Sequence, residues 1–200
     1  MAPYTMPVIT EPYHDSPGWL DKPRTQKHFV TLTSLSNEED VELFLTLLLG
    51  YNRIDAELSF EAAFDTLFLE DGIAISGGIA FFENEQIYIL PSCCCGLEGI
   101  FEMYENVVNK QSPWLGHDPD PWIEYKENNT LVWSDSAGSM ERMITIPYSH
   151  EELVQCIQKS MSDLMAFIDI PLYQWLSNRN PRVGDEMRKR MKYWLGFADM

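Results

Sequence analysis

Residues 89–98 read Ile-Leu-Pro-Ser-Cys-Cys-Cys-Gly-Leu-Glu, and at this junction an apolar strand ends and an amphipathic helix begins. Upstream, the apolar runs 79–82 and 86–90 flank a polar turn, as in a β-hairpin. Downstream, apolar residues recur at helical spacing through residues 97–108. The junction also holds three of the four cysteines, so it contains most of the reactive side chains of the chain.

Further strands and helices are expected on both sides of this junction. Apolar and aromatic runs bounded by turn residues predict strands at 122–127, 131–133 and 142–146. Helical periodicity predicts helices at 37–50, 59–69, 149–168 and 184–195. The pattern favours an α+β fold in one domain (1–200), with an antiparallel sheet of about four to six strands packed against helices.

Capping boxes mark the start of two of these helices. Ser36 with Glu39 precedes the first helix, and Ser149 with Glu152 precedes the long helix near the C-terminus. Five of the twelve prolines lie within the first 23 residues. Because proline disfavours helix at its own position and at the preceding one, we expect residues 1–35 to form an extended, proline-rich arm lying on the domain.

The charge of the chain is strongly negative and unevenly distributed. The net charge is −17, and residues 54–141 contain 17 acidic side chains but only two lysines. Nucleic acids and anionic membranes would be repelled by such a surface, so neither is expected as a partner. A basic protein partner is favoured, although an acidic face can also serve solubility alone.

The sequence indicates a cytoplasmic protein. Residues 1–7 have neither a basic segment nor an apolar segment of the kind found in signal peptides, and no apolar run is long enough to span a bilayer. The cysteines do not form the spaced pattern of a disulfide framework, which fits a reducing compartment.

Cys93, Cys94 and Cys95 are candidate reactive thiols. A helix N-terminus stabilises a thiolate, and we expect these residues at such a position. Catalysis would also need a base, for which His117 is a candidate, and zinc would need a second ligand pair that the spacing does not supply. We therefore expect no catalytic residue, metal or other cofactor. The alternative role of these cysteines is to fill a tight corner as small, buried side chains.

Residues 113–122 read Pro-Trp-Leu-Gly-His-Asp-Pro-Asp-Pro-Trp and form the second notable stretch. Prolines stiffen this loop, and rigid aromatic side chains bind partners at low entropic cost. The acids alone do not complete a calcium-binding loop. The candidate partner-binding residues are Trp114, His117, Asp118, Asp120, Trp122 and Glu124. The alternative is a loop attached to the core by its own tryptophans, and we expect this loop to be the functional neighbour of the cysteine junction.

Three segments together resemble a family of uncharacterised bacterial proteins: Ser76-Gly77-Gly78, residues 89–98 and residues 113–119. The likeness covers about residues 60–135 and implies no particular activity. By size and charge, the chain also resembles, more loosely, the immunity proteins of bacterial toxin systems. Those proteins neutralise a cationic toxin by covering its active site with an acidic surface.

The leading hypothesis is therefore a non-enzymatic, acidic protein-binding module such as a toxin-neutralising immunity protein. One alternative is a thiol- or metal-dependent enzyme centred on Cys93–Cys95 with His117. Another is a structural or scaffold protein.

Overall fold

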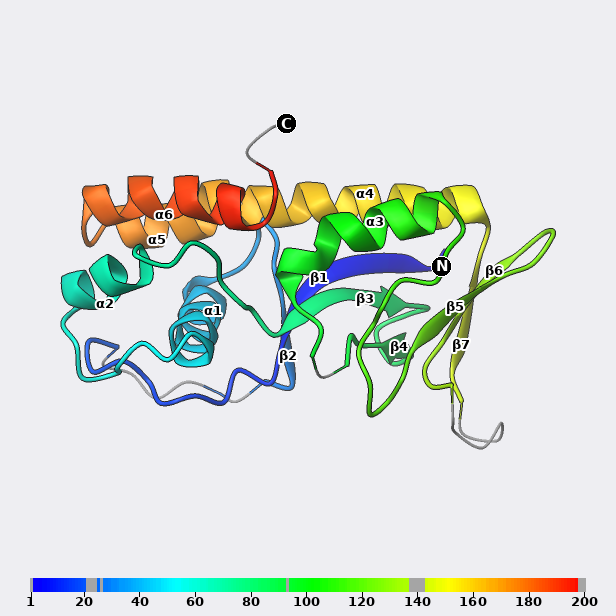
Figure 1. Cartoon of the computed structure of the whole chain (residues 1–200), viewed down its shortest axis with the longest axis horizontal. Helices are drawn as coiled ribbons and strands as arrows, with labels where there is room; N and C mark the ends of the chain where they lie inside the picture. Colours follow the sequence, from blue (N-terminus) through cyan, green and yellow to red (C-terminus); the bar gives the residue numbers. More distant parts are fainter. Residues whose placement is uncertain (1, 21–24, 26, 93, 137–142, 198–200) are drawn as a thin grey trace.

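The computed structural model describes residues 2–20, 25, 27–92, 94–136 and 143–197, which form an α+β fold (Figure 1). The four-stranded sheet has the order β2-β1-β3-β4 and the three-stranded sheet the order β5-β6-β7, and all pairs are antiparallel. The strands are β1 (Tyr4–Thr10), β2 (Phe29–Thr31), β3 (Gly77–Phe82), β4 (Tyr88–Ile89), β5 (Trp122–Tyr125), β6 (Thr130–Trp133) and β7 (Thr145–Tyr148). The expected α+β class is confirmed, with a second small sheet beside the larger one.

The helices gather at one end of the molecule and along one face of the larger sheet (Figure 1). They are α1 (Glu38–Tyr51), α2 (Phe60–Leu67), the 3-10 turn η1 (Leu97–Gly99), α3 (Ile100–Val108), α4 (His150–Phe167), the π-helical turn η2 (Ile168–Leu172), α5 (Tyr173–Ser177) and α6 (Pro181–Trp194). The long helix α4 packs along β1 and α3. One buried apolar cluster draws on both sheets and on these helices, so a continuous core supports the whole arrangement.

The N-terminal segment is part of the sheet rather than an arm lying on it. Tyr4–Thr10 forms the internal strand β1, where Val8 and Ile9 are fully buried between β2 and β3. Pro7 is tolerated because the short strand β2 pairs only with residues 8–10, so no backbone donor is needed at Pro7 on that side. The Pro7 carbonyl still accepts a hydrogen bond from Leu32 N at 2.9 Å.

The first helix begins with a capping box that is shifted by one residue from the expected pair. Asn37 accepts from Asp40 N at 3.0 Å, and the Asp40 carboxylate accepts from Asn37 N at 3.1 Å. Ser36 instead donates its hydroxyl to Thr31 O, which ties the helix entry to the end of β2. Several side chains in this stretch could cap the helix. Because Ser36 is bonded to the end of β2, Asn37 is the residue that does so.

The expected capping box of α4 is confirmed, with Ser149 and Glu152 bonded reciprocally. This helix is fixed to the opposite end of the chain by a buried hydrogen bond between the Thr5 and Ser160 hydroxyls at 2.7 Å. Tyr148, just before the helix, donates its hydroxyl to Tyr4 O at 3.0 Å.

The smaller sheet matches the expected strands closely at β5 and β6. The third strand lies at Thr145–Tyr148, later than the expected 142–146, and residue 142 lies outside the described residues. Helix α6 starts at Pro181, three residues before the expected 184, because Asn180 caps it and proline suits a first helical turn. In the described part of the chain, no helix has both the length and the apolar character needed to cross a bilayer.

Candidate functional site

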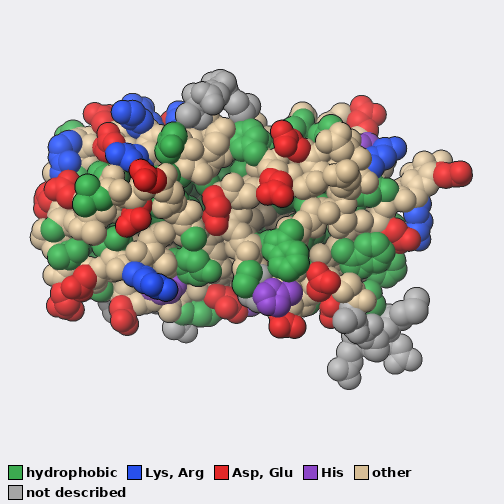
Figure 2. Space-filling model, viewed as in Figure 1, with side chains coloured by type: hydrophobic (Ala, Val, Ile, Leu, Met, Phe, Trp, Pro, Cys, Tyr) green, Lys and Arg blue, Asp and Glu red, His purple; other side chains and the backbone are tan. Residues whose placement is uncertain are grey.

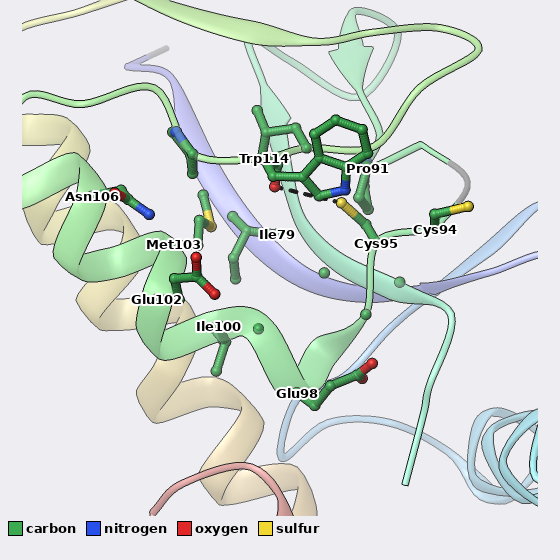
Figure 3. A pocket seen from close by; sticks show the side chains of 16 residues that line it. Ile79, Pro91, Cys94, Cys95, Glu98, Ile100, Glu102, Met103, Asn106 and Trp114 are labelled. Carbon is green, nitrogen blue, oxygen red and sulfur yellow. Dashed lines mark hydrogen bonds between the residues drawn. The ribbon is translucent and has the colours of Figure 1, made fainter.

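The cysteine junction and the loop after α3 fold directly against each other, as expected. Ser92 N donates to Leu115 O at 3.0 Å, and the Ser92 hydroxyl donates to His117 O at 2.7 Å. The Cys95 thiol donates to Trp114 O at 3.6 Å, which the dashed line in Figure 3 marks. We call residues 91, 92, 94–98 and 113–119 the corner site. The two unusual stretches of the sequence therefore form one surface.

The corner site is fixed to the start of β3. Gly77 N donates to Cys95 O at 3.3 Å, and Leu97 N donates to Ile75 O at 3.0 Å. Gly77 has φ +148°, and a Cβ there would lie 2.2 Å from Val8 O. Only glycine therefore fits where β1, β3 and the corner site approach one another.

The thiols lie just before the helical turn rather than in it. The 3-10 turn η1 begins at Leu97 after Gly96 and runs directly into α3, so Cys94 and Cys95 lie next to a helix start but not within its first turn. Cys94 is exposed in a left-handed conformation with φ +66°, and Cys95 is half-buried. Cys93 lies outside the described residues.

Cys156 and His117 lie in different parts of the fold. Burial raises the pKa of Cys156, which lies on α4 and donates weakly to Pro3 O, away from the corner site. The His117 ring lies 6.0 Å from the Trp114 indole, centroid to centroid. Within the residues that the structure describes, no group of three or more His, Cys, Asp or Glu side chains could hold a metal ion.

Three of the six candidate partner-binding residues are exposed in the corner site. Trp114 is 63% exposed, although its neighbours Pro113 and Leu115 are buried. His117 and Asp118 are also exposed and continue the same surface. The loop is therefore attached to the core by Leu115, and Trp114 is left free to make contacts.

Of the other three candidates, Trp122 and Glu124 lie in β5 of the smaller sheet and Asp120 lies just before it, and all three have partners within the chain. Trp122 stacks on Trp133 with ring centroids 6.0 Å apart. Glu124 accepts from Trp133 Nε1 at 3.2 Å and pairs with Lys126, and the Asp120 carboxylate accepts from the Ser136 hydroxyl at 2.6 Å. Trp122 therefore packs within the smaller sheet, whereas Trp114 is exposed.

A pocket of about 190 Å³ opens between the corner site and α3 (Figure 3). Its lining includes Gly77, Gly78, Pro91, Cys95 and Trp114 from the sheet and the corner site. Helix α3 contributes Ile100, Glu102, Met103 and Asn106. Glu102 and Asn106 are not among the site residues expected from the sequence. The available signal was their i, i+4 spacing on a predicted helix, which places both side chains on one face.

A second hollow of about 460 Å³ lies on the other side of Pro91 and Cys94, both of which border the two spaces. Glu11, His28 and Asp118 are among its lining residues. Figure 3 shows the Cys94 side chain pointing away from the pocket under Trp114. The N-terminal segment therefore contributes an acid and a histidine to the surroundings of the corner site.

Acidic side chains surround the corner site without matching cations. On the face in Figure 2, acids occur along the whole length, and lysines and arginines lie toward the two ends. Within the described residues, the following acids form no ion pair with a lysine or arginine: Glu83, Glu85, Glu98, Glu102, Glu105, Asp118 and Asp120. Among the residues that the structure describes, the charge of these acids is therefore not offset by ion pairs.

Comparisons of the chain with protein-family models, with curated proteins and with solved structures find no match. The resemblance of the three segments to an uncharacterised bacterial family stays a prediction.

Proposed function

We propose that this protein is a non-enzymatic, acidic protein-binding module whose corner site docks a basic protein partner. The observation that carries the proposal is the exposed indole of Trp114 on a backbone fixed by hydrogen bonds, within a surface whose acids form no ion pair with a described lysine or arginine. A toxin neutralised by this chain, as in immunity systems, is the partner that we favour.

The fixed backbone favours binding because the loop would lose little conformational entropy when a partner docks. Ser92 holds the carbonyls of Leu115 and His117, on either side of Gly116, and Leu115 is buried. Large aromatic anchors in pre-ordered surroundings dominate the binding energy of many interfaces. Trp114 is therefore expected to be the main contact.

The unpaired acids favour a cationic partner in particular. Complementary charge accelerates association and rejects partners of the wrong sign, and both effects weaken as salt increases. Glu98 and Glu102 line the pocket beside Trp114, and Asp118 follows His117 in the same surface. A basic protein would gain attraction from all three.

The test compares the full-length protein with two variants, each of which lacks one exposed aromatic side chain. Trp114→Ala removes the proposed anchor, and Tyr193→Ala removes an equally exposed aromatic side chain on α6, outside the corner site. A basic protein is captured from the native cell at low salt and identified. Its Kd is then measured for each purified variant by calorimetry.

We expect Trp114→Ala to raise the Kd by at least about tenfold and Tyr193→Ala to leave it unchanged. Raising salt from about 50 to 300 mM should weaken binding to the native protein. Recovery of no basic partner, or equal Kd values for both variants, would overturn the proposal. A loss of binding in Cys94→Ser at unchanged stability would instead favour thiol chemistry.

A further inference from the structure

The pocket under Trp114 has the size of one side chain rather than of a small-molecule ligand. Its volume of about 190 Å³ lies below the roughly 300–1,000 Å³ typical of ligand pockets. The space exists partly because Gly77 and Gly78 line it without side chains. A Cβ on Gly78 would lie 3.3 Å from Pro91 Cβ and narrow the pocket further.

Most of the wall is apolar and suits an aliphatic chain. Ile79, Pro91, Ile100, Met103 and Leu115 line the space, and the Trp114 indole lies at its mouth. Apolar contacts of this kind bury the methylene groups of a long side chain, and the indole face attracts a cation.

Two polar side chains break this apolar wall on one side. Glu102 and Asn106 lie one helical turn apart on α3, and both point toward the pocket in Figure 3. Neither side chain has a hydrogen bond or ion pair with a described residue. The Cys95 thiol, in contrast, is already bonded to Trp114 O.

The apolar wall, the indole and the two polar side chains together determine which kind of side chain could fill the pocket. A carboxylate and an amide oxygen accept hydrogen bonds, so the occupant must carry several donors and a positive charge at the end of an apolar stem. An anionic side chain would be repelled by Glu98 and Glu102. A guanidinium fits better than an ammonium, because its planar fork can bond a carboxylate and stack on an indole at the same time.

We infer that the pocket under Trp114 binds an arginine side chain of the basic partner, with the guanidinium at Glu102 and Asn106. The inference rests on the proposed function and specifies what that partner must present. It makes Glu102 a recognition residue, and it assigns Trp114 two roles, as interface anchor and as one wall of the pocket.

The test uses small probes and therefore does not depend on capturing a partner. N-acetyl-arginine methylamide is titrated into the full-length protein, and the Met103 methyl signal is followed by NMR. The matching citrulline amide has nearly the same shape without the charge, and the lysine amide has the charge without the fork. Met103→Leu assigns the signal.

We expect the arginine probe to shift the Met103 signal with a Kd of about 1 mM, as suits a small fragment, and to bind at least about fivefold tighter than the citrulline or lysine probe. Glu102→Gln should remove the preference for arginine over citrulline. Glu105→Gln removes the same charge from the same helix outside the pocket lining, and it should retain that preference.

Equal binding of arginine and citrulline, equal binding of arginine and lysine, or an unshifted Met103 signal would overturn the inference. The two proposals fail separately. If the arginine probe binds as expected but no basic protein is captured, the proposed function fails and the pocket assignment stands. If a partner binds in a Trp114-dependent way that Glu102→Gln does not weaken, the pocket assignment fails and the proposed function stands.

Discussion

The helical end of the molecule and the corner site use similar side chains in opposite ways. At the helical end, cations of α6 and its approach join separate elements: Arg182 pairs with Asp65 at 2.8 Å, and Arg179 with Glu38 at 3.4 Å. There, Trp19 packs against Phe60 in an edge-to-face contact. At the corner site, the acids lack ion-pair partners among described cations, and Trp114 is exposed.

Under the proposed function, the same residue types stabilise the fold where they have partners within the chain and bind a partner where they do not. Exposed ion pairs contribute little to stability, typically below about 1 kcal/mol each. The lack of a described ion pair at Glu102 therefore costs the fold little, and Glu98 is held by a hydrogen bond from Ile75 N at 3.1 Å. Variants that separate stability from binding test this interpretation.

The largest expected effect comes from the core at the helical end. Phe44 on α1 is fully buried and packs edge-to-face on Phe167, with ring centroids 5.0 Å apart. Phe44→Ala should lower the free energy of unfolding by about 3–5 kcal/mol because it leaves a cavity. Trp114→Ala should change it by less than about 1 kcal/mol. Urea denaturation measures both values, and equal losses would contradict the distinction between the two regions.

Gly77, against which the corner site packs, should be an exception. Unlike Trp114→Ala, a substitution at Gly77 should lower the stability of the fold substantially. Gly77→Ala places a Cβ 2.2 Å from Val8 O at a strained φ, so we expect a loss of at least about 2 kcal/mol. Gly72→Ala is the matched control, because no atom lies within 4 Å of the added Cβ. Thermal unfolding of both variants checks this, and an unaffected Gly77→Ala would mean that β1 and β3 can separate freely.

The smallest expected effect concerns α4, which runs from the smaller sheet to the helical end, and it depends on pH. Hydrogen bonds from the Ser149 backbone and hydroxyl lower the pKa of Glu152 below its ordinary value of 4.5. A lowered pKa stabilises the fold at pH values above 4.5, and the stabilisation disappears as the pH falls through the folded-state pKa. Ser149→Ala should cost about 1 kcal/mol at pH 7 through loss of the cap, and less in acid.

Hydrogen exchange locates this effect along the helix. The first turns of α4 should lose protection in Ser149→Ala, and the turns near Phe167 should keep it. Equal loss at both ends would show that the helical end and the smaller sheet unfold as one unit. A penalty that does not change between pH 7 and pH 3 would argue against the role of Glu152.

Local signals in the sequence predict much of this fold. The capping box at Ser149 and the hairpin around residues 79–90 depend on neighbouring residues, and both are present. The role of residues 4–10 depends on pairing with residues more than 65 positions away, which a proline count cannot reveal. The division into two sheets likewise depends on distant contacts.

In the candidate site, too, features that depend on neighbouring residues could be predicted, and features that depend on distant contacts could not. The loop was recognisable from Trp114 and its prolines, and its contact with the cysteine junction was expected. The separation of Trp122 from Trp114 could not be foreseen, because it depends on stacking across β5 and β6. Glu102 becomes relevant only through the tertiary position of α3, which brings it to the pocket.

The internal position of β1 has a consequence for how the chain folds. The hydrogen bond between Thr5 and Ser160 joins residues 155 positions apart, and β3 completes its ladder only with β1 in place. Contacts over such separations slow folding, because a long loop must close before they form. Because β1 is synthesised before α4, we expect its apolar face to stay accessible to chaperones until that helix is made.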